Sequence, residues 1–187
     1  MENSDGQELS EKIGAMCMEF EQIDEKQYSD NPIVDSVLRI KFGRAKARGI
    51  KVETSIRIPK QMQLDHGDIG VLYGNLVDNA VKFTDENGII EVETSLPKNE
   101  HKVYVSVSDS GKGVPDSEKR HIFEAFYKSD SSRGLDKTGS GIGLSVVKEI
   151  INAHGEIVVC KDSKSGGAKF EFSLKPAEEQ EEKNEVY

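Results

Sequence analysis

The chain has 187 residues, of which 35% are hydrophobic and 32% are charged, and this length supports one buried core and excludes two ordinary domains. Its net charge of -9, from 34 acidic and 25 basic residues, argues against a nucleic acid or an anionic membrane surface as the main partner. The two cysteines, Cys17 and Cys160, lack metal-site spacing and are expected to be free thiols of a reducing compartment, and no apolar run is long enough to span a bilayer.

The first third of the chain predicts two helices and a strand. Residues 7–25 carry apolar side chains at three- and four-residue steps, the pattern of an amphipathic helix. Asn31 and Pro32 provide an N-cap and a first-turn proline for a second helix, which Gly49 would end. Apolar and polar residues then alternate over 52–58, which predicts a half-buried strand.

The rest of the chain mixes helices and strands without regular alternation. We expect helices at 67–83 and 141–153, strands at 89–96, 103–108, 156–160 and 168–174, and an acidic, disordered tail at 176–187. This order predicts an α+β fold, a two-layer sandwich with helices covering one face of a mostly antiparallel sheet.

A polar stripe runs along the helix predicted at 67–83. Asn75, Asn79 and Lys82 are spaced i, i+4 and i+7 and therefore share one face. Because asparagine is a mediocre helix former, a solvated face would be better served by glutamate or lysine. Amide oxygens can coordinate Mg²⁺ and a lysine can meet phosphate, so the stripe predicts a ligand site, with a plain solvated face as the alternative.

The sequence contains two glycine-rich loops, one after the strand predicted at 103–108 and one before the helix predicted at 141–153. The first, at 109–113, places a carboxylate at a strand end before two glycines, and the second, at 138–144, leads into a helix whose N-terminus can bind an anion. Each loop alone is a weak signal, and an ordinary turn is the alternative for the first. Between them lies a long connection that contains Phe123, Phe126 and Tyr127, which favours a functional lid over a disordered loop.

Taken in order, four motifs resemble the N, G1, F and G2 boxes of histidine kinases of the Bergerat-fold ATPase superfamily. They are Asn75-Leu-Val-Asp-Asn79-Ala, Asp109-Ser-Gly-Lys-Gly113, Phe123-Glu-Ala-Phe126 and Gly139-Ser-Gly-Ile-Gly143-Leu. The resemblance implies a Bergerat fold, with a mixed sheet and an ATP lid at about 114–138. It implies a catalytic domain at 31–175 that uses ATP and Mg²⁺, after a linker or dimerisation-helix stub at 1–30.

The resemblance also implies roles for particular residues. Asn79 would coordinate Mg²⁺, with Asn75 beside it, Lys82 on a phosphate and Phe83 against the nucleotide. Asp109 would bind the adenine amino group. The remaining nucleotide contacts would come from Gly111, Gly113, Val114, Lys128, Arg133, Thr138, Gly139, Ser140, Gly141, Ile142, Gly143 and Leu144.

Catalysis would involve Asn75, Lys82, Lys128 and Arg133, the last two as basic residues that reach the terminal phosphates. Gyrase-like relatives carry a glutamate as general base four residues before the Mg²⁺ asparagine, where this chain has Asn75. A neutral amide cannot take a proton from water, so transfer to an external nucleophile is favoured over hydrolysis.

None of the four histidines lies in a motif similar to the family's phosphoacceptor box; they are His66, His101, His121 and His154. We therefore expect a separate or missing dimerisation domain to supply the acceptor, with Phe123 and Phe126 docking on its helices, and a response regulator downstream. The fragment would lie on the cytoplasmic side of a membrane-associated sensor, without direct membrane or nucleic-acid contact. The alternatives are a serine kinase of the anti-sigma-factor type and a non-catalytic nucleotide-sensing module.

Overall fold

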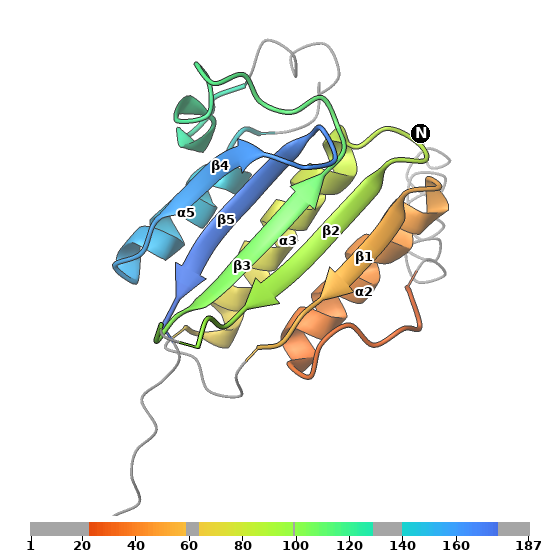
Figure 1. The fold of residues 1–187 in the computed structure, drawn as a ribbon, viewed down its shortest axis with the longest axis horizontal. Coiled ribbons are helices and arrows are strands. Elements are labelled where there is room, and N and C mark those ends of the chain that lie inside the picture. The colour runs from red at the N-terminus through yellow and green to blue at the C-terminus, as the bar shows by residue number, and fades with distance from the viewer. Residues whose placement is uncertain (1–22, 59–63, 99, 129–139, 176–187) are drawn as a thin grey trace, which may run out of the picture.

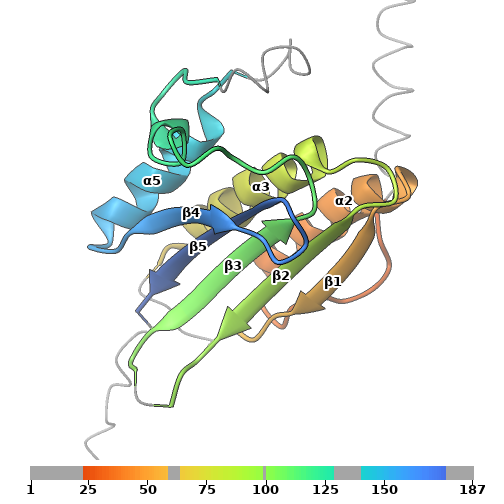
Figure 2. The same cartoon turned by 45° about the horizontal axis from the view of Figure 1, so that its top comes forward.

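The computed structural model describes residues 23–58, 64–98, 100–128 and 140–175. Three helices, α2 (Pro32–Ala47), α3 (His66–Phe83) and α5 (Gly143–Ala153), cover one face of a five-stranded sheet (Figures 1 and 2). This arrangement confirms the predicted α+β sandwich of two layers. Within the described residues, no helix combines the length and apolar character that a membrane crossing needs.

The sheet is mixed and mostly antiparallel. Its strands are β1 (Lys51–Ser55), β2 (Ile89–Ser95), β3 (Val103–Asp109), β4 (Val158–Asp162) and β5 (Ala168–Leu174). Their spatial order is β1-β2-β3-β5-β4, in which β1 and β2 are parallel and every other neighbouring pair is antiparallel. The central strand β3 therefore ends beside the turn that joins β4 to β5.

The core lies between β3 and α3. On β3, the alternate residues Val103, Val105 and Val107 are almost completely buried, as the period of two in a strand requires. On α3, the apolar residues Leu72, Leu76 and Ala80 are fully buried, and the helix packs against α2, α5 and β3. Because α3 is held on three sides, the face that carries the polar stripe has a fixed position relative to the sheet.

The helix predicted at 7–25 can be compared with the structure only at its last three residues. Residues 7–22 lie outside the described residues, and residues 23–25 are not helical. The following residues pack on α2, because the Asp35 carboxylate accepts hydrogen bonds from the N–H groups of Tyr28 (2.6 Å) and Ser29 (3.2 Å). The packed structure thus begins upstream of Asn31, the boundary expected from the sequence.

Tyr28 and Asp24 fasten this segment to α2. The Tyr28 ring is buried and meets Phe42 edge to face, with 4.8 Å between the ring centroids. Asp24 bonds to the Tyr28 hydroxyl and pairs with Lys46. Burial raises the pKa of Asp24, but the bonds from Lys46, Tyr28 and a backbone N–H outweigh it and lower that pKa to about 2.

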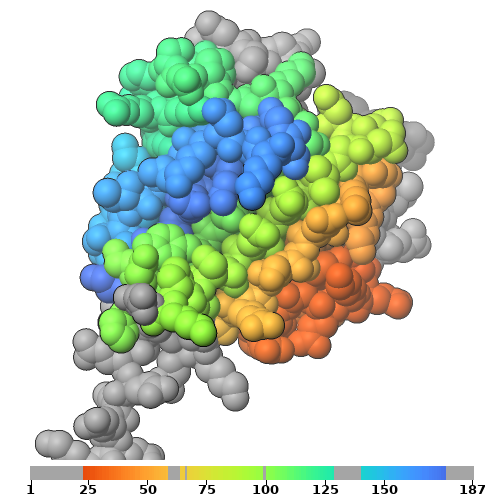
Figure 3. All heavy atoms as spheres, viewed as in Figure 1, coloured from red at the N-terminus to blue at the C-terminus, as the bar shows by residue number. Residues whose placement is uncertain are grey.

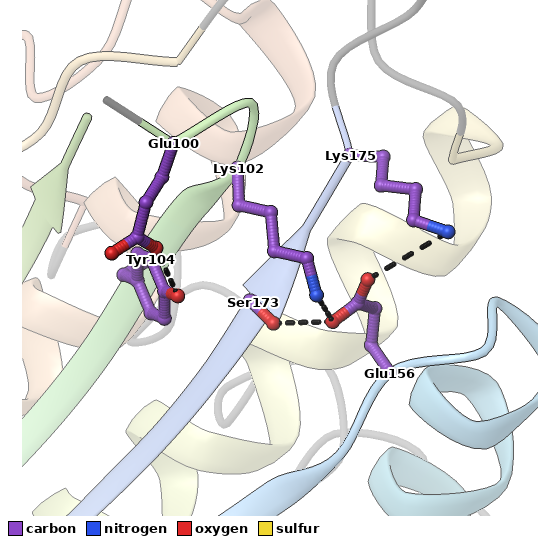
Figure 4. A network of polar contacts seen from close by, with 6 residues as sticks. All are labelled: Glu100, Lys102, Tyr104, Glu156, Ser173 and Lys175. Carbon is purple, nitrogen blue, oxygen red and sulfur yellow. Dashed lines mark hydrogen bonds and ion pairs between the residues drawn. The ribbon is translucent and has the colours of Figure 1, made fainter. Parts of the chain in front are cut away.

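The strand expected at 156–160 begins two residues later than predicted, because Glu156 takes part in a polar network (Figure 4). Its Oε2 accepts from Lys102 Nζ at 2.7 Å and from Ser173 Oγ at 2.5 Å, and its Oε1 lies 4.0 Å from Lys175 Nζ. Burial raises the pKa of Glu156, but the pairing with Lys102 and Ser173 outweighs it and lowers the pKa overall. The network joins the start of β3, the end of β5 and the turn before β4.

Candidate functional site

The two asparagines of the polar stripe are half-buried on α3. Asn75 Nδ2 donates to the Val71 carbonyl oxygen at 2.9 Å, and Asn79 Nδ2 donates to the Asn75 carbonyl oxygen at 2.8 Å. These bonds use the amide N–H groups and leave each Oδ1 as an acceptor for a ligand. The neighbouring Asp78 is exposed and pairs instead with Lys41 of α2, with 2.6 Å between Nζ and Oδ2.

The start of α5 lies directly against this stripe. A Cβ added to Gly143 would lie 2.6 Å from Asn75 Oδ1, so only glycine allows the two helices to approach this closely. The helix begins after Ile142 without a side-chain cap, which leaves N–H groups of its first turn available to an anion. The structure therefore brings Gly143, in the second glycine-rich loop, against Asn75 of the polar stripe.

The described ends of the lid also meet at the start of α5. The Phe126 N–H donates to the Gly141 carbonyl oxygen at 2.9 Å. Both residues have positive φ, +65° for Phe126 and +72° for Gly141, and a Cβ on Gly141 would lie 3.0 Å from the Phe126 backbone. Arg133, Thr138 and Gly139 lie outside the described residues, whereas Lys128 is described and half-buried.

Asp109 lies at the same end of the sheet, at the last position of β3 (Figure 1). Its carboxylate is buried, and Oδ1 accepts from the N–H groups of Gly111 (2.8 Å) and Ala168 (3.2 Å). Burial raises the pKa of Asp109, and the two backbone hydrogen bonds offset this only in part. Because Oδ1 is used within the fold, Oδ2 is the oxygen left to accept from a ligand.

Gly167 is a residue of this site that the sequence reasoning did not single out. A Cβ there would lie 2.2 Å from Asp109 Oδ1 and 2.4 Å from the Asp109 carbonyl oxygen. The β4–β5 turn can therefore pass directly over the carboxylate only because the position is glycine. The adjacent glycines in SGGAKF were the available signal, but the sequence alone does not reveal that this turn adjoins Asp109.

The first glycine-rich loop packs on the end of α3. A Cβ on Gly111 would lie 2.2 Å from the Phe83 carbonyl oxygen, which gives this glycine a packing role beside the one expected from the sequence. Phe83 is half-buried, and Lys82 Nζ lies 5.0 Å from the centroid of its ring. Val114, after the loop, is half-buried against the core, as is Leu144 on α5.

The two phenylalanines expected to dock on a partner have different surroundings. Phe123, in the short helix η1 (His121–Phe123), is 6% exposed and packs edge to face on Phe170, with 6.2 Å between the ring centroids. Phe126 is 74% exposed. Phe123 therefore anchors the start of the lid to the core and is withdrawn from the surface, and Phe126 alone remains accessible to a partner.

The histidines are spread over the chain. His66 is the first residue of α3, and His101 is exposed in the turn between β2 and β3. His121 contacts Glu124 in the first part of the lid, with 2.8 Å between Nδ1 and Oε1. His154 Nδ1 lies 2.8 Å from the Ile150 carbonyl oxygen at the end of α5.

Comparison with known proteins identifies a family. Residues 65–178 match the family model described as histidine kinase-, DNA gyrase B- and HSP90-like ATPase. The chain is 31% identical over 121 residues to the sensor histidine kinase WalK of Bacillus subtilis, covering 65% of this chain and 20% of WalK. This chain thus spans about a fifth of that relative's length.

Solved structures give the same result. The catalytic domain of the histidine kinase ThkA aligns with a TM-score of 0.67 and 26% identity, covering 79% of this chain and 92% of that domain. Full-length ShkA in complex with AMPPNP aligns with a TM-score of 0.63 and 29% identity, covering 79% of this chain and 30% of ShkA.

Proposed function

Because this chain belongs to the family of histidine kinase-, DNA gyrase B- and HSP90-like ATPases, we propose that it binds Mg·ATP and transfers the γ-phosphoryl group to a histidine of a phosphoacceptor domain. The similarity to WalK and to the catalytic domain of ThkA supports this activity over the others in the family. Since the chain spans about a fifth of WalK, the substrate and partners of the whole protein are part of the proposal.

Asp109 would recognise adenine. Its Oδ2 is a buried acceptor, and the exocyclic amino group of adenine is a donor of matching type. Guanine carries a carbonyl oxygen at that position and would place an acceptor against an acceptor. Gly113 and Val114 follow the carboxylate and would lie beside the purine, and Phe83 would contact the nucleotide from the end of α3.

The asparagine stripe suits a metal ion that arrives with the nucleotide. Among the described residues, no three His, Cys, Asp or Glu side chains gather into a metal site. Mg²⁺ commonly keeps several waters and takes only one or two protein oxygens in addition to phosphate oxygens, and Asn79 Oδ1 can be such a ligand. Bound Mg²⁺ would neutralise charge on the phosphates.

The phosphates would extend from Asn79 toward the start of α5. Lys82 lies one helical turn beyond Asn79 on the same face of α3. The first-turn N–H groups of α5, after Ser140, Gly141 and Ile142, would bind phosphate oxygens. Lys128 would reach the terminal phosphates together with Arg133, Thr138 and Gly139 of the lid, which lie outside the described residues.

Asn75, by its residue type and its position, is the main support for transfer over hydrolysis. It lies four residues before Asn79 and meets Gly143 at the start of α5, where the terminal phosphate is expected. Because a neutral amide cannot accept a proton from water, this position offers hydrolysis no general base. The acceptor domain would supply the nucleophile and the group that takes its proton.

Phe126 would contact the helices of that acceptor domain. It is 74% exposed, and its backbone N–H is hydrogen-bonded to the Gly141 carbonyl oxygen, close to the proposed phosphate site. The acceptor histidine would belong to a dimerisation domain outside this chain, within a membrane-associated sensor whose catalytic part is cytoplasmic. An aspartate of a response regulator would then receive the phosphoryl group.

Binding of ATP with and without Mg²⁺, measured by calorimetry, tests the site assignment. The Asn79→Ala variant is expected to lose the Mg²⁺-dependent part of the affinity, by about tenfold or more, as for removal of a metal ligand or its support. Asp78→Asn is the matched control, because Asp78 is exposed on the same turn and pairs with Lys41. Equal Mg²⁺ dependence in the wild type and Asn79→Ala would contradict the assignment.

A further inference from the structure

A groove of about 460 Å³ follows the outer edge of β4, between this strand, α5 and the start of the lid. Since β4 is the last strand in the order of the sheet, its outer edge has no neighbouring strand among the described residues. The β4–β5 hairpin (blue) and the start of the lid (teal) lie side by side in Figure 3, and Lys119 of the lid pairs with Asp162 of β4 at 2.7 Å.

This edge exposes apolar side chains. Ile157 is 72% exposed and Val159 is 36% exposed, and residues two apart in an extended chain project to the same face. An unpaired strand edge with exposed apolar residues favours pairing with another chain, and natural proteins commonly cover such edges. The groove therefore has the features of a surface that accepts an extended segment between a strand and a helix.

The rim of the groove is basic. Lys148 of α5 and Arg120 of the lid both line it. A third basic residue, Lys119, is paired with two carboxylates, Asp116 at 2.6 Å and Asp162 at 2.7 Å, so these three side chains together carry one net negative charge. The two positive charges of Arg120 and Lys148 exceed that one negative charge, so the groove stays positive overall and an acidic segment is the complementary occupant.

The chain itself contains a segment of this kind. Residues 176–187 include five glutamates and one lysine, and they continue from Lys175. Lys175 Nζ lies 4.0 Å from Glu156 Oε1, and Glu156 directly precedes Ile157, so the segment starts at one end of the groove (Figure 4). Twelve extended residues reach up to about 40 Å, more than twice the roughly 17 Å of a five-residue strand.

We propose that the acidic segment 178–187 of this chain binds in the groove beside β4, with its glutamates facing Arg120 and Lys148. The segment has the composition of a disordered tail and would become ordered on docking. The covalent connection at Lys175 keeps its effective concentration in the millimolar range, so weak contacts suffice. The proposal is independent of the phosphotransfer activity.

Hydrogen exchange of backbone amides in the full chain tests this inference. Four glutamates of the segment are changed together, Glu178→Gln, Glu179→Gln, Glu181→Gln and Glu182→Gln, and a second variant carries Lys148→Glu. In both, exchange of the amides of 157–162 should become at least about tenfold faster than in the wild type, while β3 amides stay unchanged. Lys164→Glu, an exposed charge in the β4–β5 turn outside the groove, is the matched control and should have no effect.

Two results would overturn the proposal. Equal exchange rates of 157–162 in the wild type and in the glutamine variant would show that the segment does not cover β4. Protection that rises with protein concentration would assign the groove to a second copy of the chain. If Lys148→Glu also speeds exchange in β3, that variant has destabilised the fold. The test then rests on the glutamine variant, because its substitutions lie outside the described fold.

Discussion

The two carboxylate oxygens of Asp109 differ in their hydrogen bonds within the fold. Oδ1 is saturated by two backbone N–H groups, which fixes the plane of the carboxylate and positions Oδ2. In the Asp109→Asn variant the amide oxygen can keep the backbone bonds, so the NH₂ group would face the amino group of adenine. We expect ATP affinity, measured by calorimetry, to fall by about tenfold or more, the effect of an unmatched buried polar group.

The same substitution should leave the fold intact, because it removes a buried charge without removing the backbone hydrogen bonds. Asp116→Asn is a suitable control, since Asp116 is an exposed acid that pairs with Lys119. Full ATP affinity in Asp109→Asn would contradict the proposed adenine contact.

The raised pKa of Asp109 predicts a pH dependence of nucleotide binding. Burial favours the protonated form, so on acidification Asp109 takes up its proton at a higher pH than an exposed aspartate. For an acid with a raised pKa, ionisation costs folding stability above that pKa and protonation relieves the cost. Nucleotide binding should change in the opposite direction, because the proposed acceptor for adenine is the ionised carboxylate.

We therefore expect ATP affinity to decline on acidification before exposed aspartates titrate, in calorimetry over a pH series. The Asp109→Asn variant should lack this component. A wild-type affinity that follows only the titration of the ATP phosphates would exclude Asp109 as the group responsible.

For single residues, the sequence predicts relative positions correctly where the spacing along one helix determines them. Asn75 and Asn79 share a face because of the helical period alone. Gly167 and the burial of Phe123 depend on contacts between segments far apart in the chain, with Asp109 and Phe170 respectively. Such contacts cannot be predicted from the pattern of neighbouring residues in the sequence.

Among the helices and strands, the contact between α3 and α5 would assemble the proposed site. Gly143→Ala would place a Cβ 2.6 Å from Asn75 Oδ1, so the helices must separate or the amide must turn. We expect a loss of about 1–3 kcal/mol in the free energy of unfolding, from denaturant titration, together with weaker ATP binding.

Gly74→Ala is the matched control on α3. A Cβ there would lie 3.9 Å from a Val37 methyl group, an ordinary contact, and alanine in a helix interior gains up to about 1 kcal/mol over glycine. If Gly143→Ala is as stable as Gly74→Ala and binds ATP normally, the close contact between the helices has no role in the site.

Most elements could be located from periodicity and capping residues, as for α2, where Asn31 accepts from the N–H groups of Ile33 and Val34. The start of β4 could not be located in this way. Glu156 fits the alternating pattern of a strand, but in the structure its carboxylate is hydrogen-bonded to Lys102 and Ser173. The sequence before Asn31 predicts a helix or a linker, whereas Tyr28 and Ser29 pack on α2. In both cases tertiary contacts override the local pattern.

For the whole molecule, the net charge of -9 is a property of the two ends. Residues 1–22 contain six acidic residues and one lysine, and residues 176–187 contain five and one. Subtracting these from 34 acidic and 25 basic residues leaves 23 of each between residues 23 and 175. The central part of the chain is neutral overall, so in the proposed site the attraction of a nucleotide would come from local groups such as Lys82 and the start of α5.

We propose that the chain transfers phosphate to a histidine and does not hydrolyse ATP. The most direct measurement incubates the chain with Mg²⁺, γ-labelled ATP and a separate protein that carries the dimerisation helices and histidine of a sensor histidine kinase. We predict an acid-labile label on the histidine of the helix protein and little free phosphate. Rapid release of free phosphate without labelled histidine, an acid-stable label on serine, or nucleotide binding without any transfer would exclude histidine phosphotransfer by this chain.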